Sequence, residues 1–187
     1  HAGPMPVPPD FIDDLREAFS AAAHSFFLDA GTFARAVGTG ISLDSSEATN
    51  WFNELEKQFE FVVYVTDPDL TEWSKKAIRQ ADLVLCVGRH ETDPAPDAVA
   101  PNPIELFVHA LHGADDVRLV LLHASQGDIS GTRRWLDMRP PMRMHHHIAR
   151  GHGPHYRRLF RFINGTALGL VACGGGAFSA AHIGVYQ

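Results

Sequence analysis

The sequence contains few cysteines, no excess of basic residues and no long apolar run. Its 187 residues include two cysteines, Cys86 and Cys173. These are too few for a disulfide framework and are expected to be small buried residues in a reducing, cytoplasmic compartment. The formal net charge of -6 argues against a nucleic-acid partner, because such binding requires a basic face. No apolar run approaches the roughly 18 residues of a membrane-spanning helix.

Two chemical motifs are also absent. The sequence lacks Gly-x-x-x-x-Gly-Lys-Ser/Thr, and nothing near residues 1–15 supplies a glycine-rich cradle for phosphates. It also lacks Gly-x-Ser-x-Gly, the nucleophile elbow of many serine esterases, and no serine lies in such a context. Serines outside any such context include Ser42, Ser125, Ser130 and Ser179. The chain therefore has no recognisable phosphate clamp and no recognisable serine nucleophile.

What is present is an alternation of amphipathic helices with short apolar strands. Continuous apolar runs at 59–65, 81–87 and 117–122 are typical of strands buried on both faces. Strands separated by helices form right-handed crossovers and an open parallel sheet. The sequence predicts a three-layer α/β fold, degenerate P-loop or Rossmann-like, with a mostly parallel sheet flanked by helices.

The apolar periodicity is interrupted between about Arg139 and Tyr156, where proline, glycine and histidine are frequent. The segment 138–147 is expected to be irregular. This interruption predicts a division into an α/β domain at 1–150 and a second part at 151–187, which starts with a linker helix.

Polar side chains follow several of the expected strands, where ligands bind in doubly wound sheets. Asp29, Thr66, Asp67 and Asp69 occupy such positions. The stretch 61–87 resembles the second half of deviant P-loop ATPases of the partitioning type, in which Asp67 would direct magnesium. Because the phosphate loop and its lysine are missing, Asp67 is interpreted as a vestigial candidate at most, and no cofactor is expected. A role in turns and helix caps is the alternative.

Histidines crowd one segment of the chain. Imidazoles bind zinc, but adjacent residues of an extended run point in opposite directions. The segment is interpreted as a flexible polar linker that gains protons below about pH 6.5, and no metal site is expected, although metal binding remains the alternative. The histidines concerned are His145, His146, His147, His152 and His155.

The segment Ala167-Leu-Gly-Leu-Val-Ala-Cys-Gly-Gly-Gly-Ala177 and the following His182-Ile-Gly-Val combine an apolar run, a glycine triplet and a small-residue stretch. A strand that feeds glycines into a helix N-terminus presents free N–H groups to an oxyanion. This segment resembles the opening of the patatin-like phospholipase domain. The resemblance implies that Gly174, Gly175 and Gly176 are oxyanion-hole donors, and that the Ser–Asp dyad lies outside this chain.

Two positions depart from that pattern. Cys173 stands where the family has its first glycine, and Phe178 and Ser179 stand where it has a basic residue and a further glycine. Loss of the cation weakens the positive field beside the oxyanion, while the glycine amides remain able to donate.

Upstream segments resemble the domain that precedes the patatin domain in the neuropathy target esterase family. They include Phe61-Val-Val-Tyr-Val-Thr-Asp-Pro-Asp, Ile78-Arg-Gln-Ala-Asp, Thr132-Arg-Arg-Trp-Leu and His145-His-His-Ile. That family comprises lysophospholipase-like serine esterases with upstream cyclic-nucleotide-binding domains, and its intermediate domain is P-loop-like with a degraded loop. The resemblance implies that this chain is part of a longer parent protein that hydrolyses lipid esters and is cytoplasmic and peripheral to a membrane. The chain by itself is then expected to be inactive.

Two alternatives remain at this stage. The chain is either a fragment of such an esterase or a regulatory, partner-binding α/β module with a vestigial nucleotide site; an intact small enzyme lacks a convincing acid–base pair. The strand expected within 167–187 has no sheet partner of its own domain, so it is expected to pack on its own chain, to swap, or to form a homodimer.

Overall fold

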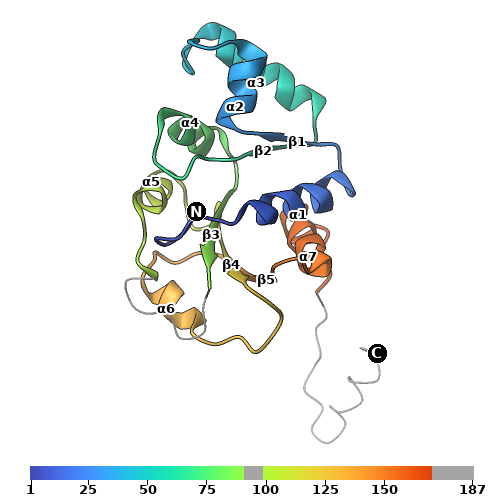
Figure 1. Ribbon diagram of the computed structural model, residues 1–187, viewed down its shortest axis with the longest axis vertical. Coiled ribbons are helices and arrows are strands. Elements are labelled where there is room, and N and C mark those ends of the chain that lie inside the picture. Colours follow the sequence, from blue (N-terminus) through green and yellow to red (C-terminus); the bar gives the residue numbers. More distant parts are fainter. Residues whose placement is uncertain (91–98, 170–187) are drawn as a thin grey trace, which may run out of the picture.

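The computed structural model describes residues 1–90 and 99–169. Within them helices and strands alternate along the chain (Figure 1). The elements are α1 (Pro9–Ser20), β1 (Ser25–Leu28), α2 (Ala30–Val37), α3 (Ser46–Gln58), β2 (Phe61–Tyr64), α4 (Glu72–Gln80), β3 (Val84–Arg89), α5 (Pro103–Leu111), β4 (Val117–His123), α6 (Thr132–Asp137), β5 (Met144–Ala149) and α7 (Gly153–Ile163).

Among the described residues all strand pairings are parallel, and the strands form two sheets. β1 pairs with β2, while β3, β4 and β5 pair in that order. Parallel strands need crossover connections, and each connection here carries at least one helix. The molecule is therefore an α/β protein with parallel sheets flanked by helices, as the sequence predicts. The single open sheet expected from the sequence is divided between β2 and β3, which are not paired with each other.

The second sheet is covered on both faces, which β4 shows most clearly. Leu119 and Leu121 pack against α5 and α6, whereas Val120 and Leu122 pack against α1 and α7. None of these four side chains is more than 2% exposed. Because neighbouring side chains of a strand point to opposite faces, the continuous apolar run of β4 fills two cores at once.

The first sheet is also covered on both faces. Leu28 and Tyr64 contribute to a cluster formed with α2, α3 and α4. Phe27 and Val63 lie on the other face, in the cluster that contains α1. Unlike β4, β2 is only half-buried along its whole length, because it has a paired strand on one side alone.

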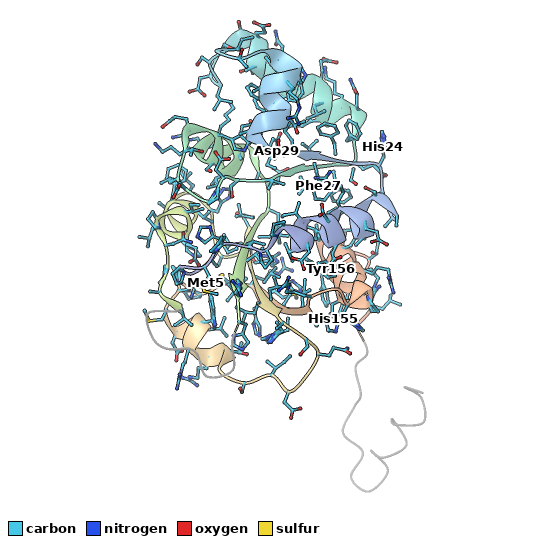
Figure 2. The ribbon with its side chains drawn as sticks, viewed as in Figure 1. Met5, His24, Phe27, Asp29, His155 and Tyr156 are labelled. Atoms are coloured by element: carbon cyan, nitrogen blue, oxygen red, sulfur yellow. The ribbon has the colours of Figure 1, made fainter. Side chains whose placement is uncertain are left out.

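The helix α1 connects the two sheets. Phe19 contacts Phe27 of β1, Phe61 of β2 and Phe160 of α7, with ring centroids 6.1, 5.7 and 4.9 Å away. Figure 2 labels Phe27 above α1 and Tyr156 of α7 below it. The apolar face of one amphipathic helix is thus shared by strands of both sheets.

The segment 138–147 is not irregular throughout, contrary to the sequence-based expectation. β5 runs parallel to β4 over Met144–Ala149, so the interpretation of the histidine-rich stretch as a flexible linker is wrong. The ladder uses backbone groups alone, so histidines are compatible with it, and the fully buried Ile148 fixes which face points inward. His146 lies on the same face and is itself buried.

The helix α7 packs against α1 and β5. Its residues Tyr156, Leu159 and Phe160 belong to the cluster that contains β4. The division of the chain after residue 150 stays a prediction. No helix among residues 1–90 and 99–169 is long and apolar enough to cross a membrane.

Candidate functional site

Asp67 lies just after β2, in the turn that leads to α4. Its Oδ2 accepts a hydrogen bond of 2.6 Å from the hydroxyl of Thr71, and its backbone N–H donates to Ser74 Oγ at 3.1 Å. Thr71 is the N-cap residue of α4. Asp67 therefore supports the start of a helix, a geometry that agrees with the turn-and-cap alternative. The carbonyl of Asp69 in the same turn also accepts from Ser74 Oγ, at 2.8 Å.

Asp29 has a similar place after β1, at the start of α2 (Figure 2). Its Oδ1 accepts from the backbone N–H of Thr32 at 2.6 Å. This hydrogen bond, with help from Arg35, holds the pKa of the Asp29 carboxyl below its usual value. The carboxylate thus stabilises the N-terminus of α2, as expected for an N-cap aspartate.

A P-loop enzyme binds phosphate at the connection between a strand and the following helix, and the segment to compare with it here runs from the isolated bridge at Ala2 into α1. Ala2 forms a parallel bridge with Gly88 of β3, and its N–H donates to the carbonyl of Val87 at 2.7 Å. A P-loop cradles phosphates with backbone N–H groups, but proline has none. The connection and the first helical residue contain four prolines: Pro4, Pro6, Pro8 and Pro9.

A carboxylate also takes up one of the remaining N–H groups. The backbone N–H of Gly3 donates to Oε2 of Glu105 at 2.7 Å. Glu105 is completely buried and pairs with Arg139 through two hydrogen bonds of 2.6 and 3.0 Å. The Gly3 N–H is therefore occupied by Glu105, and the prolines supply no N–H groups to this connection.

Arg139 satisfies its other donors within the same buried site. Its Nη1 donates to the carbonyls of Val99 and Trp135 at 2.8 and 3.0 Å, and its guanidinium stacks on the Trp135 ring. A buried ion pair contributes to stability only when its remaining hydrogen-bonding groups have partners. The Glu105–Arg139 pair meets that condition and fastens the N-terminal segment to α5 and α6.

Three histidines meet at the carboxyl ends of β3, β4 and β5, where the sheet of an α/β protein presents its ligand-binding edge. His123 Nε2 and His147 Nδ1 are 2.7 Å apart. The ring of His90 lies 4.7 Å from that of His123 and 5.9 Å from that of His147. The Thr132 hydroxyl reaches His147 Nε2 at 3.3 Å.

The protonation of this cluster follows from its surroundings. His90 Nε2 lies 2.6 Å from the Ser130 carbonyl, which only accepts, so this nitrogen donates the hydrogen bond, and the buried Nδ1 has no partner in the described part of the chain. Burial, and then the neighbouring imidazoles, lower the pKa of His123 and lower that of His147 to about 4. His123 and His147 are therefore neutral at pH 7.

Neutral imidazoles are the form that binds metal ions. Nevertheless, within residues 1–90 and 99–169 no three or more His, Cys, Asp or Glu side chains are placed to hold a metal. Among the five histidines of the rich segment, His145 and His147 are neighbours with rings 5.4 Å apart, as are His152 and His155 at 4.3 Å. His146 points to the opposite face, beside Phe162.

The other residues singled out from the sequence fall into two groups. Cys86 is buried, as predicted, and burial raises the pKa of its thiol to about 12. The backbone carbonyl of Ser130 accepts a hydrogen bond from His90, and Ser42 Oγ accepts one from the Asp44 amide at 3.4 Å. The second group lies outside the described residues: Cys173, Gly174, Gly175, Gly176, Phe178 and Ser179.

The sequence interpretation overlooked Glu105, Arg139 and the meeting of His90 with His123. A signal existed for Glu105, since Asn102-Pro-Ile-Glu105 is a capping box, and the structure contains both of its hydrogen bonds. A signal existed for the histidines too, because His90 and His123 each stand at the end of an apolar run. No local pattern identifies Arg139 as the partner of Glu105.

These features define a class: a P-loop-like α/β domain whose phosphate loop has been replaced. Residues 5–162 match the model of the neuropathy target esterase family P-loop-like domain. The chain belongs to this family.

Curated relatives agree with this assignment. The chain is 28% identical to patatin-like phospholipase domain-containing protein 7 of Mus musculus, over 95% of this chain and 15% of the relative. It is 28% identical to lysophospholipase NTE1 of Mycosarcoma maydis, over 95% of this chain and 12% of the relative. It is 26% identical to neuropathy target esterase sws of Drosophila melanogaster, over 98% of this chain and 14% of the relative. No solved structure matches the chain.

Proposed function

We propose that this chain is a fragment of a patatin-like serine lipid esterase, inactive by itself, and that the full-length parent protein hydrolyses acyl esters of lysophospholipids or phospholipids. The observation that carries the proposal is the family match over residues 5–162, together with relatives that are named as patatin-like phospholipases and lysophospholipases. The chain spans 12–15% of the length of those relatives, so the activity is proposed for the parent protein.

The chemical contribution of this chain lies in its last residues. In the proposal, the backbone N–H groups of Gly174, Gly175 and Gly176 stabilise the oxyanion that forms when a serine attacks the ester carbonyl, while the serine and its aspartate base come from the polypeptide beyond Gln187. Preorganised N–H donors of this kind typically lower the barrier by about 3–4 kcal/mol each. Without the nucleophile no acyl-enzyme forms, so the isolated chain is inactive.

The α/β domain itself acts as a regulatory or positioning module with a vestigial nucleotide site. Support comes from the prolines before α1 and from Glu105, whose carboxylate occupies the Gly3 amide. In the parent, this module joins the esterase domain to upstream cyclic-nucleotide-binding domains. The parent is proposed to be cytoplasmic and peripheral to a membrane, where its lipid substrate resides.

Esterase activity tests the proposal directly. The full-length protein is expected to hydrolyse lysophosphatidylcholine and a short-chain p-nitrophenyl ester, whereas residues 1–187 alone give no turnover above background. In the full-length protein Gly175→Pro removes one N–H donor and is expected to lower kcat by about 10²-fold or more. The matched variant Gly175→Ala keeps the N–H. Turnover by the isolated chain, or equal kcat for both variants, contradicts the proposal.

Calorimetry tests the vestigial character of the nucleotide site. Titration of the chain with ATP or GTP in the presence of Mg²⁺ is expected to give no heat of binding at micromolar nucleotide. Asp67→Asn serves as the comparison, since it would change the titration only if Asp67 held magnesium. Micromolar affinity that is lost in Asp67→Asn would restore a nucleotide-binding function.

A further inference from the structure

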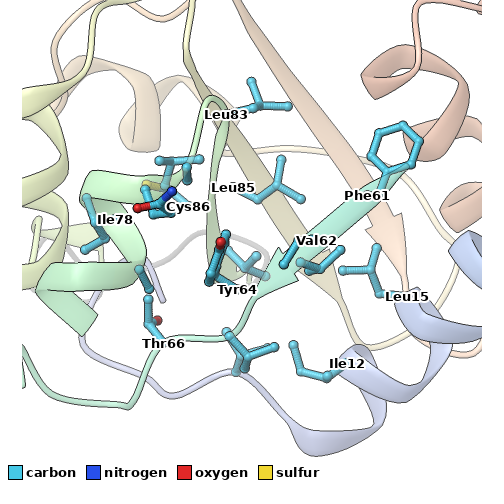
Figure 3. A pocket seen from close by; sticks show the side chains of 18 of the residues that line it. Ile12, Leu15, Phe61, Val62, Tyr64, Thr66, Ile78, Leu83, Leu85 and Cys86 are labelled. Atoms are coloured by element: carbon cyan, nitrogen blue, oxygen red, sulfur yellow. The ribbon is translucent and has the colours of Figure 1, made fainter. Parts of the chain in front are cut away.

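A cavity of about 680 Å³ separates the two sheets. It lies between β2 and β3 and is lined mainly by apolar side chains, including Val62 of β2, Leu85 of β3 and Leu15 of α1 (Figure 3). We call this cavity the slot. Its position in the middle of the fold is unusual, because the centre of a parallel sheet is normally its most completely buried part.

The backbone of β2 presents one edge to the slot. The N–H groups of Phe61 and Val65 donate to carbonyls on the β1 side. Since successive N–H groups of a strand point to opposite sides, those of Val62 and Tyr64 face the slot. β2 therefore offers a row of donors and acceptors to a further strand, as an edge strand does.

The backbone of β3 presents its edge from the other side. The N–H groups of Val84 and His90 donate to carbonyls on the β4 side, so Leu85 and Val87 face the slot. One of these groups is already used: the Val87 carbonyl accepts from Ala2, which bridges to β3 in the parallel sense. Ala2 itself is only 1% exposed.

We propose that the slot holds one extended apolar strand, parallel to β2 and β3, formed by the residues that lead into His1 in the full-length protein. The Ala2–Gly88 bridge sets its register: His1 lies opposite Val87, and the three preceding residues lie opposite Val84–Cys86. The inserted strand joins the two sheets into one, with the order β1, β2, inserted strand, β3, β4, β5.

A strand fits the slot better than other occupants. It supplies N–H and C=O groups at the repeat that both edges require, whereas a lipid acyl chain supplies none and leaves buried backbone groups unpaired. A strand from a second copy would have to enter where Ala2 already runs along β3. The chain covers 15% of the length of the relative from Mus musculus, so longer polypeptides of this family exist.

Hydrogen–deuterium exchange on the full-length protein tests the insertion without any substitution. The exchange rates of the Val62, Tyr64 and Leu85 amides are expected to lie within about tenfold of the rates in β4. With the inserted strand in place, β2 and β3 would each be hydrogen-bonded to a strand on both sides, as β4 is. In the 187-residue chain the same amides are expected to exchange at least tenfold faster than in the full-length protein, while that of Val63, which points to β1, changes less. Fast exchange of the slot-facing amides in the full-length protein overturns the proposal.

A pair of variants in the full-length protein separates this strand from other occupants. Ala2→Pro removes the N–H that donates to Val87 and is expected to accelerate exchange of the slot-facing amides at least tenfold, with β4 unchanged. Ala2→Gly keeps the N–H and should have little effect. Protection that depends on protein concentration identifies a second copy, and protection that disappears on delipidation identifies an acyl chain. Either result overturns the proposal, as does protection that is unaffected by Ala2→Pro.

Discussion

The two sheets of this protein are stabilised in different ways. β4 has a paired strand on each side and a helical layer on each face, and its side chains from Leu119 to Leu122 are at most 2% exposed. β2 has one paired strand, and all of its residues are half-buried. The same kind of apolar sequence is therefore fully buried in one half of the molecule and partly exposed in the other.

The first sheet compensates through aromatic side chains on its helices. Phe33 of α2 stacks on Phe52 of α3, with ring centroids 5.3 Å apart, and both lie near Trp73 of α4. Such pairs contribute about 0.5–1.5 kcal/mol beyond the area that they bury. The comparison shows that strand pairing on both sides and a buried ion pair stabilise the region around β4, whereas aromatic packing between helices supports β2.

The largest expected effect is in the second half, at the buried ion pair. Glu105→Gln leaves Arg139 charged and without its counter-ion in a fully buried site, which costs about 3–5 kcal/mol. Denaturant unfolding measures the loss. Glu54→Gln in α3 is the matched control, because its partner Lys57 and Glu54 itself are well exposed and the expected change is below about 1 kcal/mol. Equal losses for the two variants contradict the prediction.

A pair of valine substitutions compares the two sheets directly. Val120→Ala in β4 is expected to cost about 2 kcal/mol through lost burial and the cavity left behind. Val63→Ala in β2 makes the same chemical change at a half-buried site and is expected to cost less than about 1 kcal/mol. Both values come from chemical denaturation of the 187-residue chain. A loss at Val63 as large as that at Val120 would show that β2 is already enclosed.

Acid should destabilise the second half of the molecule, in part through His146. Burial lowers the pKa of His146 from its ordinary value of 6.5 to about 4. Between these values the unfolded chain binds a proton that the folded chain does not, so stability falls as the pH falls through this window. His146→Leu is expected to remove on the order of 1–2 kcal/mol of that loss. The measurement is the free energy of unfolding at pH 8 and pH 4.5; parallel pH profiles for wild type and variant would refute the assignment.

The smallest expected effect concerns a helix cap in the first half. Thr71→Ala removes the hydroxyl that accepts from the Ser74 amide and donates to Asp67, at a cost of about 1 kcal/mol. Thr71→Ser keeps the hydroxyl and should restore most of the thermal midpoint. Failure of serine to restore it would indicate that the methyl group of Thr71, rather than its hydroxyl, is important.

Much of the fold could be predicted because local patterns specify it. The apolar run at 117–122 and the capped amphipathic helices gave the elements around β4 and β1 almost at their observed positions. β5 was missed because its histidines carry no apolar signal, and the strand is held by pairing with β4. The separation of β2 from β3 was not predictable either, since pairing between strands depends on contacts far apart in the sequence.

The candidate sites were predictable only where the relevant residues are close in the chain. Asp67 and Thr71 lie in one turn, so a capping role could be anticipated. Glu105 and Arg139 are separated by 34 residues, and nothing local links them. The histidines 90, 123 and 147 meet because three parallel strands end at one edge, which is a property of the topology rather than of any motif.

The position of α1 across both sheets has a consequence for biosynthesis. α1 is made well before its partner α7: Asp10 pairs at 2.7 Å with Arg150, which lies just before α7, and Phe19 contacts Phe160 of α7. At about 5–20 residues per second, translation separates them by on the order of ten seconds. During that interval the apolar face of α1 has no complete binding site. The nascent chain should therefore be a chaperone substrate until α7 leaves the ribosome.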